Sequence, residues 1–132
     1  MRLSVLLLSF LLMSSWAYAN EGSSSGEGGM EYLEITPKIT VNLAEPRSYL
    51  LVNIQLLAEG PQAIEKLKKH MPAIKHELIM LFSGRSTDSI QTMEQREALR
   101  KETAAAIKKT LEHYENSDGF RDAFFSEFLI SY

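Results

Sequence analysis

The chain has 132 residues, a formal net charge of −3 and no cysteine, and 45% of its residues are hydrophobic. This length and apolar fraction allow one folded domain with a packed core. The acidic balance argues against nucleic-acid binding, because the chain has no overall excess of cations for phosphate groups. The lack of cysteine excludes disulfides, thiol nucleophiles and thiolate metal ligands.

Residues 1–19 have the anatomy of a secretory signal peptide, which predicts cleavage between Ala19 and Asn20. Arg2 precedes an apolar run, and small residues stand immediately before the expected cleavage site. The alternative is a retained membrane anchor, but a spanning helix needs about 20 apolar residues and this run is shorter. In both cases we expect the rest of the chain to lie outside the cytoplasm. Residues 20–30 are rich in Gly and Ser and are predicted to be a flexible linker, so the folded domain is expected over residues 31–132.

Three short strands are predicted at the start of this domain. The first covers residues 31–35 and is followed by Pro37, which places it at an edge or a bend of the sheet. The second covers residues 38–43 and is expected to pair with the third, at residues 49–58, across a short turn. The apolar residues of the third strand alternate with polar ones, which indicates one buried face: Leu50, Val52, Ile54 and Leu56.

The apolar spacing changes to that of a helix after Gly60. A stripe at intervals of three and four residues predicts a helix that begins at Pro61 and ends near Gly84: Ile64, Leu67, Met71, Ile74, Leu78 and Leu81. Pro72 lies inside this pattern and predicts a kink or a break near Met71. A polar connector leads to a second helix, which Thr92 and Gln95 are expected to begin with a capping box.

Residues 122–132 form the most apolar predicted strand of the chain. Strict alternation would place Phe124, Phe128 and Ile130 on one face, and Phe125 and Leu129 on the other. An exposed apolar strand is an aggregation hazard, so we expect this one to be central or well covered. The order β-β-β-α-α-β then predicts an α+β domain, with a small, mainly antiparallel sheet and two helices packed on one face.

No residue pattern indicates catalysis, a cofactor or a bound metal. His70 and His76 are six residues apart, whereas metal ligands on a helix need intervals of three or four. The glycines of the linker do not lie between a strand and a helix, as a phosphate-binding loop requires. The hydroxyl-rich connector at residues 83–89 has no histidine or acid placed by spacing to activate a nucleophile. We therefore expect a protein that is not an enzyme.

Two groups of residues are candidates for a partner surface. The outer face of the first helix carries Lys66, Lys69 and Lys75, which could bind an anionic lipid surface or an acidic protein. On the closing strand, Phe125 and Leu129 share the face that the helices are not expected to cover. The alternatives are an ordinary solvated helix face and a strand that is buried on both sides.

Several short motifs occur in an order that resembles a known family. They are a Val41-Asn42-Leu43 opening, an Arg47-Ser-Tyr-Leu strand, a His70-Met-Pro-Ala-Ile helix, a Leu99-Arg100 pair and a closing Asp122-Ala-Phe-Phe-Ser-Glu-Phe strand. Together these segments, over about residues 32–130, resemble the flagellar basal-body protein family FliL. The order of the motifs carries the resemblance, because no single motif is specific.

The resemblance implies a fold similar to the stomatin/prohibitin-type domain and a place in the periplasm beside the flagellar motor. It implies a scaffold or regulator that supports motility through contacts with stator or basal-body proteins, as a homo-oligomer and without catalytic residues. Family members usually have a basic cytoplasmic tail and a retained membrane helix, whereas only Met1 and Arg2 precede the apolar run here. We therefore expect contact with the inner membrane only if the leader is retained. The family also often has Gly where Gln95 stands, so the start of the second helix is expected to differ locally.

The alternative function is a periplasmic binding or scaffold module that is unrelated to the flagellum. It would recognise a lipid, a small apolar ligand or another envelope protein. For an apolar ligand it predicts a sizeable apolar cavity between the helices and the sheet.

Overall fold

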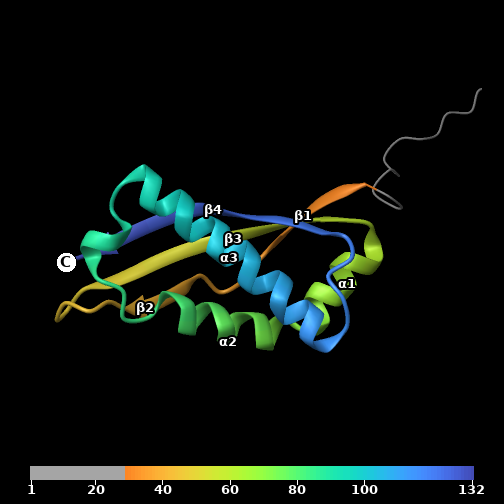
Figure 1. The fold of residues 1–132 in the computed structure, drawn as a ribbon, viewed down its shortest axis with the longest axis horizontal. Helices are drawn as coiled ribbons and strands as arrows, with labels where there is room; N and C mark the ends of the chain where they lie inside the picture. The colour runs from red at the N-terminus through yellow and green to blue at the C-terminus, as the bar shows by residue number, and fades with distance from the viewer. Residues whose placement is uncertain (1–28) are drawn as a thin grey trace, which may run out of the picture.

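A computed structural model describes residues 29–132 of the chain (Figure 1). The predicted leader, the Ala19–Asn20 cleavage site and most of the predicted linker lie outside the described residues. The first strand, β1 (Met30–Glu34), begins at the start of the described part. None of the helices within residues 29–132 has the length and apolar character that crossing a membrane requires.

The sheet is organised around its longest early strand, β3 (Tyr49–Glu59). β1 and β2 (Ile39–Asn42) pair antiparallel with successive halves of one edge of β3, and the bend predicted at Pro37 lies between them. The pairing of β2 with β3 across a short turn is as predicted. β4 (Phe120–Ser131) pairs antiparallel with nearly the whole opposite edge of β3.

The helical part contains three α-helices, where the sequence predicted two. α1 (Pro61–Lys69) and α2 (Met71–Phe82) together cover the first predicted helix, which breaks at His70. Pro72 becomes the second residue of α2, a position where a missing backbone N–H leaves no helical hydrogen bond unmade. The predicted break is therefore confirmed, and it divides one amphipathic stripe between two helices. The element order becomes β-β-β-α-α-α-β.

The connector to α3 (Met93–Tyr114) is more ordered than its polar composition indicated. It contains a 3₁₀ helix, η2 (Thr87–Ile90), whose Ile90 side chain is completely buried. The predicted capping box of α3 is present, because Thr92 Oγ1 accepts a hydrogen bond from Gln95 N and Gln95 Oε1 accepts one from Thr92 N, each at 3.0 Å. The buried side chains of Ile90 and Thr87 thus anchor a connector whose composition is polar.

The core lies between one face of the sheet and the helices, and α2 and α3 run side by side across it (Figure 1). The alternating residues of β3 are all buried, as predicted. The helices contribute a second set of fully buried side chains: Leu67, Ile74, Leu78, Phe82, Leu99, Ile107 and Leu111. The other face of the sheet carries no helix in the described part of the chain, and Tyr32, Tyr49 and Leu129 are exposed there.

The closing strand was predicted to be central or well covered, and it is not central. β4 lies at an edge, and β3 is its one partner strand among the described residues. Its cover comes from the side chains of α3 rather than from another strand. The guanidinium of Arg96 lies 4.5 Å from the centre of the Phe128 ring, and that of Arg100 lies 5.1 Å from the Phe124 ring.

The predicted faces of β4 are also wrong in its first half, because the strand contains a bulge at Ser126. Asn53 pairs with Glu127 and Ile54 pairs with Phe125, so Ser126 has no opposite residue. An inserted residue reverses the alternation upstream of it. Phe125, not Phe124, therefore shares the helix-covered face with Phe128. Phe124 turns to the open face.

Candidate interaction surfaces

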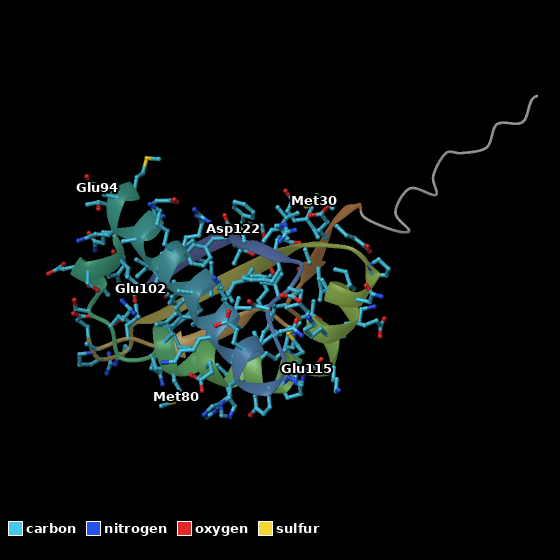
Figure 2. The ribbon with its side chains drawn as sticks, turned by 45° about the vertical axis from the view of Figure 1, so that its right-hand side comes forward. Met30, Met80, Glu94, Glu102, Glu115 and Asp122 are labelled. Atoms are coloured by element: carbon cyan, nitrogen blue, oxygen red, sulfur yellow. The ribbon has the colours of Figure 1, made fainter. Side chains whose placement is uncertain are left out.

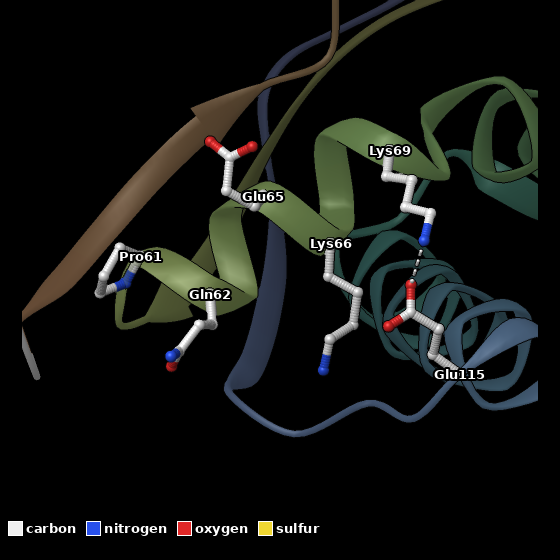
Figure 3. Close-up of a pocket in the computed structure, with 6 residues that line it drawn as sticks. All are labelled: Pro61, Gln62, Glu65, Lys66, Lys69 and Glu115. Carbon is white, nitrogen blue, oxygen red and sulfur yellow. Dashed lines mark ion pairs between the residues drawn. The ribbon is translucent and has the colours of Figure 1, made fainter.

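The three candidate lysines of the first helical segment all bond to neighbouring loops. Lys66 Nζ donates to Asn116 Oδ1 and to the carbonyl of Asp118, and Lys75 Nζ donates to the carbonyl of Thr36. Lys69 Nζ lies 3.4 Å from Glu115 Oε2 (Figure 3). These contacts hold α1 and α2 against the neighbouring loops. They account for the three lysines without a lipid or a second protein bound to them.

The surface around Lys66 and Lys69 carries both charges. The hollow drawn in Figure 3 has a volume of about 600 Å³ and also has Glu65 and Glu115 on its walls. Two lysines and two carboxylates leave no local excess of positive charge. This balance does not favour an anionic lipid surface at this hollow.

The histidines gather at one end of the molecule, although their spacing in the sequence did not indicate it. The ring of His70 stacks on Tyr114, and the ring of His113 meets Tyr114 edge-on. His76 and His113 both line a hollow of about 740 Å³ between α2 and α3. Even so, no group of three or more metal-ligating side chains forms a metal site within residues 29–132.

Glu115 is the charged centre of this region. Its Oε2 atom lies 2.7 Å from His70 Nε2 and 3.4 Å from Lys69 Nζ. The hydrogen bond from His70, supported by the Lys69 charge, holds the pKa of Glu115 below its usual value of 4.5. The carboxylate therefore ties the end of α3 to the junction of α1 and α2.

We expect this interaction to contribute to stability at neutral pH and to be lost in acid. The pKa of Glu115 is lower in the folded state, so the unfolded state binds more protons just below pH 4.5. Stability should therefore fall as the pH falls through the folded pKa, and Glu115→Gln should make that fall shallower. Urea unfolding at several pH values, from about pH 6 to about pH 3, measures how the free energy of unfolding changes with pH across the range in which carboxyl groups titrate. Glu77→Gln, at an exposed position without a bonded partner among the described residues, is the matched control; equal slopes for both variants would contradict the expectation.

A second charged network joins α3 to β4. Arg100 holds Glu97 with two hydrogen bonds, at 2.9 Å and 2.7 Å, and its Nη1 donates to Asp122 Oδ1 at 2.8 Å and to the Ala123 carbonyl at 2.9 Å. The two carboxylates raise the pKa of Arg100, and Arg100 in turn lowers the pKa of Glu97. The Leu99-Arg100 motif pointed to this residue, but its partners on β4, Asp122 and Ala123, are more than 20 positions away in the chain and could not be read from it.

The structure separates the two candidate residues of the closing strand. Phe125 packs edge-on against Phe82, with ring centroids 6.2 Å apart, and belongs to the core side. Leu129 lies on the open face and is 51% exposed. The two residues therefore do not form one surface, because the bulge between them puts them on opposite faces.

The open face of the sheet is divided by an ion pair. Lys38 Nζ lies 2.5 Å from Glu127 Oε1, and Glu127 pairs across the ladder with Asn53. The pair therefore spans β3 at Asn53, whose Oδ1 atom is buried without a hydrogen-bond partner among the described residues. Apolar side chains remain on both sides of this bridge: Tyr49, Leu51 and Leu129 on one side, and Tyr32, Leu57 and Phe124 on the other.

Comparison with known proteins matches the whole folded domain to one family. The sequence model described as "Flagellar basal body-associated protein FliL" matches residues 32–130. The chain belongs to the FliL family. The match begins inside β1 and ends inside β4, so it contains every helix of the described domain, all of β2 and β3, and part of β1 and β4.

A curated relative supports the same assignment. "Flagellar protein FliL" of Aquifex aeolicus (strain VF5) is 31% identical over 106 residues, which are 79% of this chain and 63% of the relative. The chain therefore spans less than two thirds of the length of this FliL protein. The resemblance inferred from the ordered motifs is confirmed by both comparisons.

Proposed function

We propose that this FliL-family chain is a non-enzymatic accessory protein of the flagellar basal body. It supports or regulates motility through contacts with stator or other basal-body proteins, acting from the periplasm as a homo-oligomer. The observation that carries the proposal is the extent of the family match, from residue 32 to residue 130. Such a match makes the shared unit a complete domain with its core, rather than a short motif.

The side-chain geometry is compatible with a binding role. The charged networks of Arg100 and Glu115 join secondary-structure elements to each other, and neither contains a nucleophile beside a base. The open sheet face and the hollow between α3 and β4 offer apolar and aromatic surface of the kind that protein partners cover. The stomatin/prohibitin-type fold implied by the resemblance is part of this proposal, and helices on one face of an antiparallel sheet are consistent with it.

The location is proposed from the leader. N-terminal sequencing of the protein from the periplasmic fraction tests it directly. A mature chain that begins at Asn20 would support cleavage and a periplasmic protein. A chain that keeps residues 1–19 would instead support an inner-membrane anchor facing the periplasm.

Deletion of the gene tests the motility role. We expect cells that still assemble flagella, seen by electron microscopy, but that swim and swarm poorly, most of all in viscous medium where the motor load is high. The wild-type gene should restore motility, and a Gly119→Ala gene, whose product is expected to be unstable, should not. Normal swimming at every viscosity would overturn the proposal, and so would the loss of flagella.

The alternative, a periplasmic module for a lipid or a small apolar ligand, has less support. It needs apolar space between the helices and the sheet, and that region is filled by completely buried side chains such as Leu50, Leu78 and Phe82. No observation specific to this structure favours it.

A further inference from the structure

A hollow of about 590 Å³ lies along the free edge of β4. Its walls come from α3 and from β4: Met93, Arg96, Glu97, Arg100, Phe124, Phe125 and Phe128. Phe124 is on the open face of the sheet and Phe128 is on the helix-covered face. Side chains from both faces can line one hollow only at the edge of a sheet, so the hollow runs beside the backbone of β4. Figure 2 shows the side chains of this region, with Glu94 in the first turn of α3 and Asp122 on β4.

The first half of this edge is closed by side chains. The N–H of Ala123 donates to Asp122 Oδ1 at 2.9 Å, and its carbonyl accepts a hydrogen bond from Arg100 Nη1 at 2.9 Å. The N–H and the C=O of Ala123 therefore both point away from β3. Side chains supply the two hydrogen bonds that a neighbouring strand would otherwise make. Covering an edge with charged side chains in this way discourages pairing with other strands.

The second half of the edge is open. Hydrogen-bonded and non-hydrogen-bonded pairs alternate along an antiparallel ladder. Ala123, opposite Leu56, is a non-hydrogen-bonded position. By the same register, the backbone N–H and C=O groups of Phe128 and Ile130 also point away from β3. The bond from Ile35 N to Ile54 O, at 2.9 Å, agrees with this phase because it turns the Ile54 carbonyl away from β4. No hydrogen bond within residues 29–132 occupies the backbone groups of Phe128 and Ile130 on that side.

One cation beside the open half has no carboxylate partner in the described structure. Arg100 is saturated by Glu97 and Asp122, whereas Arg96 lies over the Phe128 ring and its Nε donates to the Ile90 carbonyl at 3.1 Å. Arg96 is in none of the ion pairs formed among residues 29–132. Of the charged side chains that line the hollow, Arg96 is therefore the one without a carboxylate partner among residues 29–132. At the mouth of the hollow, the Met93 side chain is 87% exposed.

We propose that the open edge of β4 at Phe128 and Ile130 binds an extended, acidic segment of a partner protein as an added strand. The outward backbone groups would supply the hydrogen bonds, Met93 and Phe128 would receive an apolar side chain, and Arg96 would pair with a carboxylate. α3 bounds the hollow on one side, which suits a single extended segment better than the edge of a second folded domain. This inference goes beyond the motility role, since it concerns binding by the purified chain and does not require a flagellar partner.

Nuclear magnetic resonance of the isotope-labelled full chain tests the proposal. The probe is the capped peptide Thr-Val-Thr-Glu-Val-Thr-Val, added up to millimolar concentration. We expect the amides of Phe128 and Ile130 to shift and to become protected from hydrogen exchange, while Leu129, whose amide already faces β3, gains no protection. A peptide that leaves Phe128 and Ile130 unprotected, or that protects another region instead, overturns the proposal. Protection that appears without peptide and rises with protein concentration also overturns it, because the occupant would then be a second copy of the chain.

Charge reversal separates binding from structure. Replacing the peptide's Glu by Lys should weaken binding to the wild-type chain about two- to fivefold, the range of an exposed ion pair. Arg96→Glu should reverse that preference, whereas Lys108→Glu, the same charge change at an exposed position elsewhere on α3, should leave it unchanged. If Arg96→Glu does not fold, Arg96→Gln should abolish the preference without reversing it. An acid preference that survives the loss of Arg96 contradicts the proposal.

Blocking the edge itself gives an independent test. Ile130→Pro removes an outward N–H that makes no bond to β3, and an edge strand tolerates proline at such a position. We expect at least a tenfold loss of peptide affinity with the β3–β4 pairing retained in the spectra. Unchanged affinity in a folded Ile130→Pro chain would exclude strand addition at this edge.

Discussion

Replacing Gly119 by alanine is expected to lower the free energy of unfolding by about 3 kcal/mol or more. Gly119 has φ of 88°, where a side chain is strained. A Cβ atom there would lie 2.5 Å from Ala63 Cβ and 2.9 Å from the Glu59 carbonyl oxygen. Neither neighbour can yield easily, because Ala63 is buried in α1 and the Glu59 N–H donates to the Gly119 carbonyl at 2.7 Å. The end of β3, the start of α1 and the turn before β4 meet at this glycine.

Gly84→Ala is the matched control. Gly84 also has a positive φ, of 78°, but a Cβ atom there would meet nothing within 4 Å. Its substitution should therefore cost only the backbone strain, about 1 kcal/mol. Urea unfolding of both variants measures the difference. Equal losses would show that the contact with Ala63 has no energetic consequence.

Truncating Phe82 to alanine is expected to cost about 3–5 kcal/mol, a large part of the stability of a domain of this size. The Phe82 side chain is completely buried at the end of α2. Its ring meets Phe125 of β4 edge-on at 6.2 Å, so the substitution opens a cavity and also removes an aromatic pair. Met80→Ala, at a side chain that is 64% exposed (Figure 2), should change stability by less than about 0.5 kcal/mol.

Urea unfolding of alanine variants also checks the bulge at Ser126. With the bulge, Phe125 belongs to the core side and Phe124 to the open face, so Phe125→Ala should cost more than Phe124→Ala. A double-mutant cycle between Phe82 and Phe125 should give a coupling of about 0.5–1.5 kcal/mol. A larger cost for Phe124→Ala would favour strict alternation along β4 and would contradict this register.

The features that could be predicted from the sequence are those that depend on residues close together in the chain. The alternation in β3, the capping box of Thr92 and the break caused by Pro72 each depend on residues at most a few positions apart. The ordered motifs of the FliL family could be read for the same reason, and both comparisons confirm them. The amphipathic stripe of the first predicted helix was correct in most of its positions, because burial of an apolar face is the main term in folding.

The candidate surfaces depended on contacts between distant segments. Lys66 meets Asn116 across 50 positions of the chain, and His70 meets Glu115 across 45, so a basic helix face became a set of loop contacts. Likewise, an alternating pattern cannot show that one residue, Ser126, is looped out of the ladder with β3. Whether an apolar strand lies at the centre or at an edge depends on which strands pair, which is a property of the whole sheet. Local hydrogen bonding and periodicity thus determine the helices and strands of this chain. The pairing of the strands and the packing of the helices on the sheet determine that β4 lies at an edge, with half of that edge open.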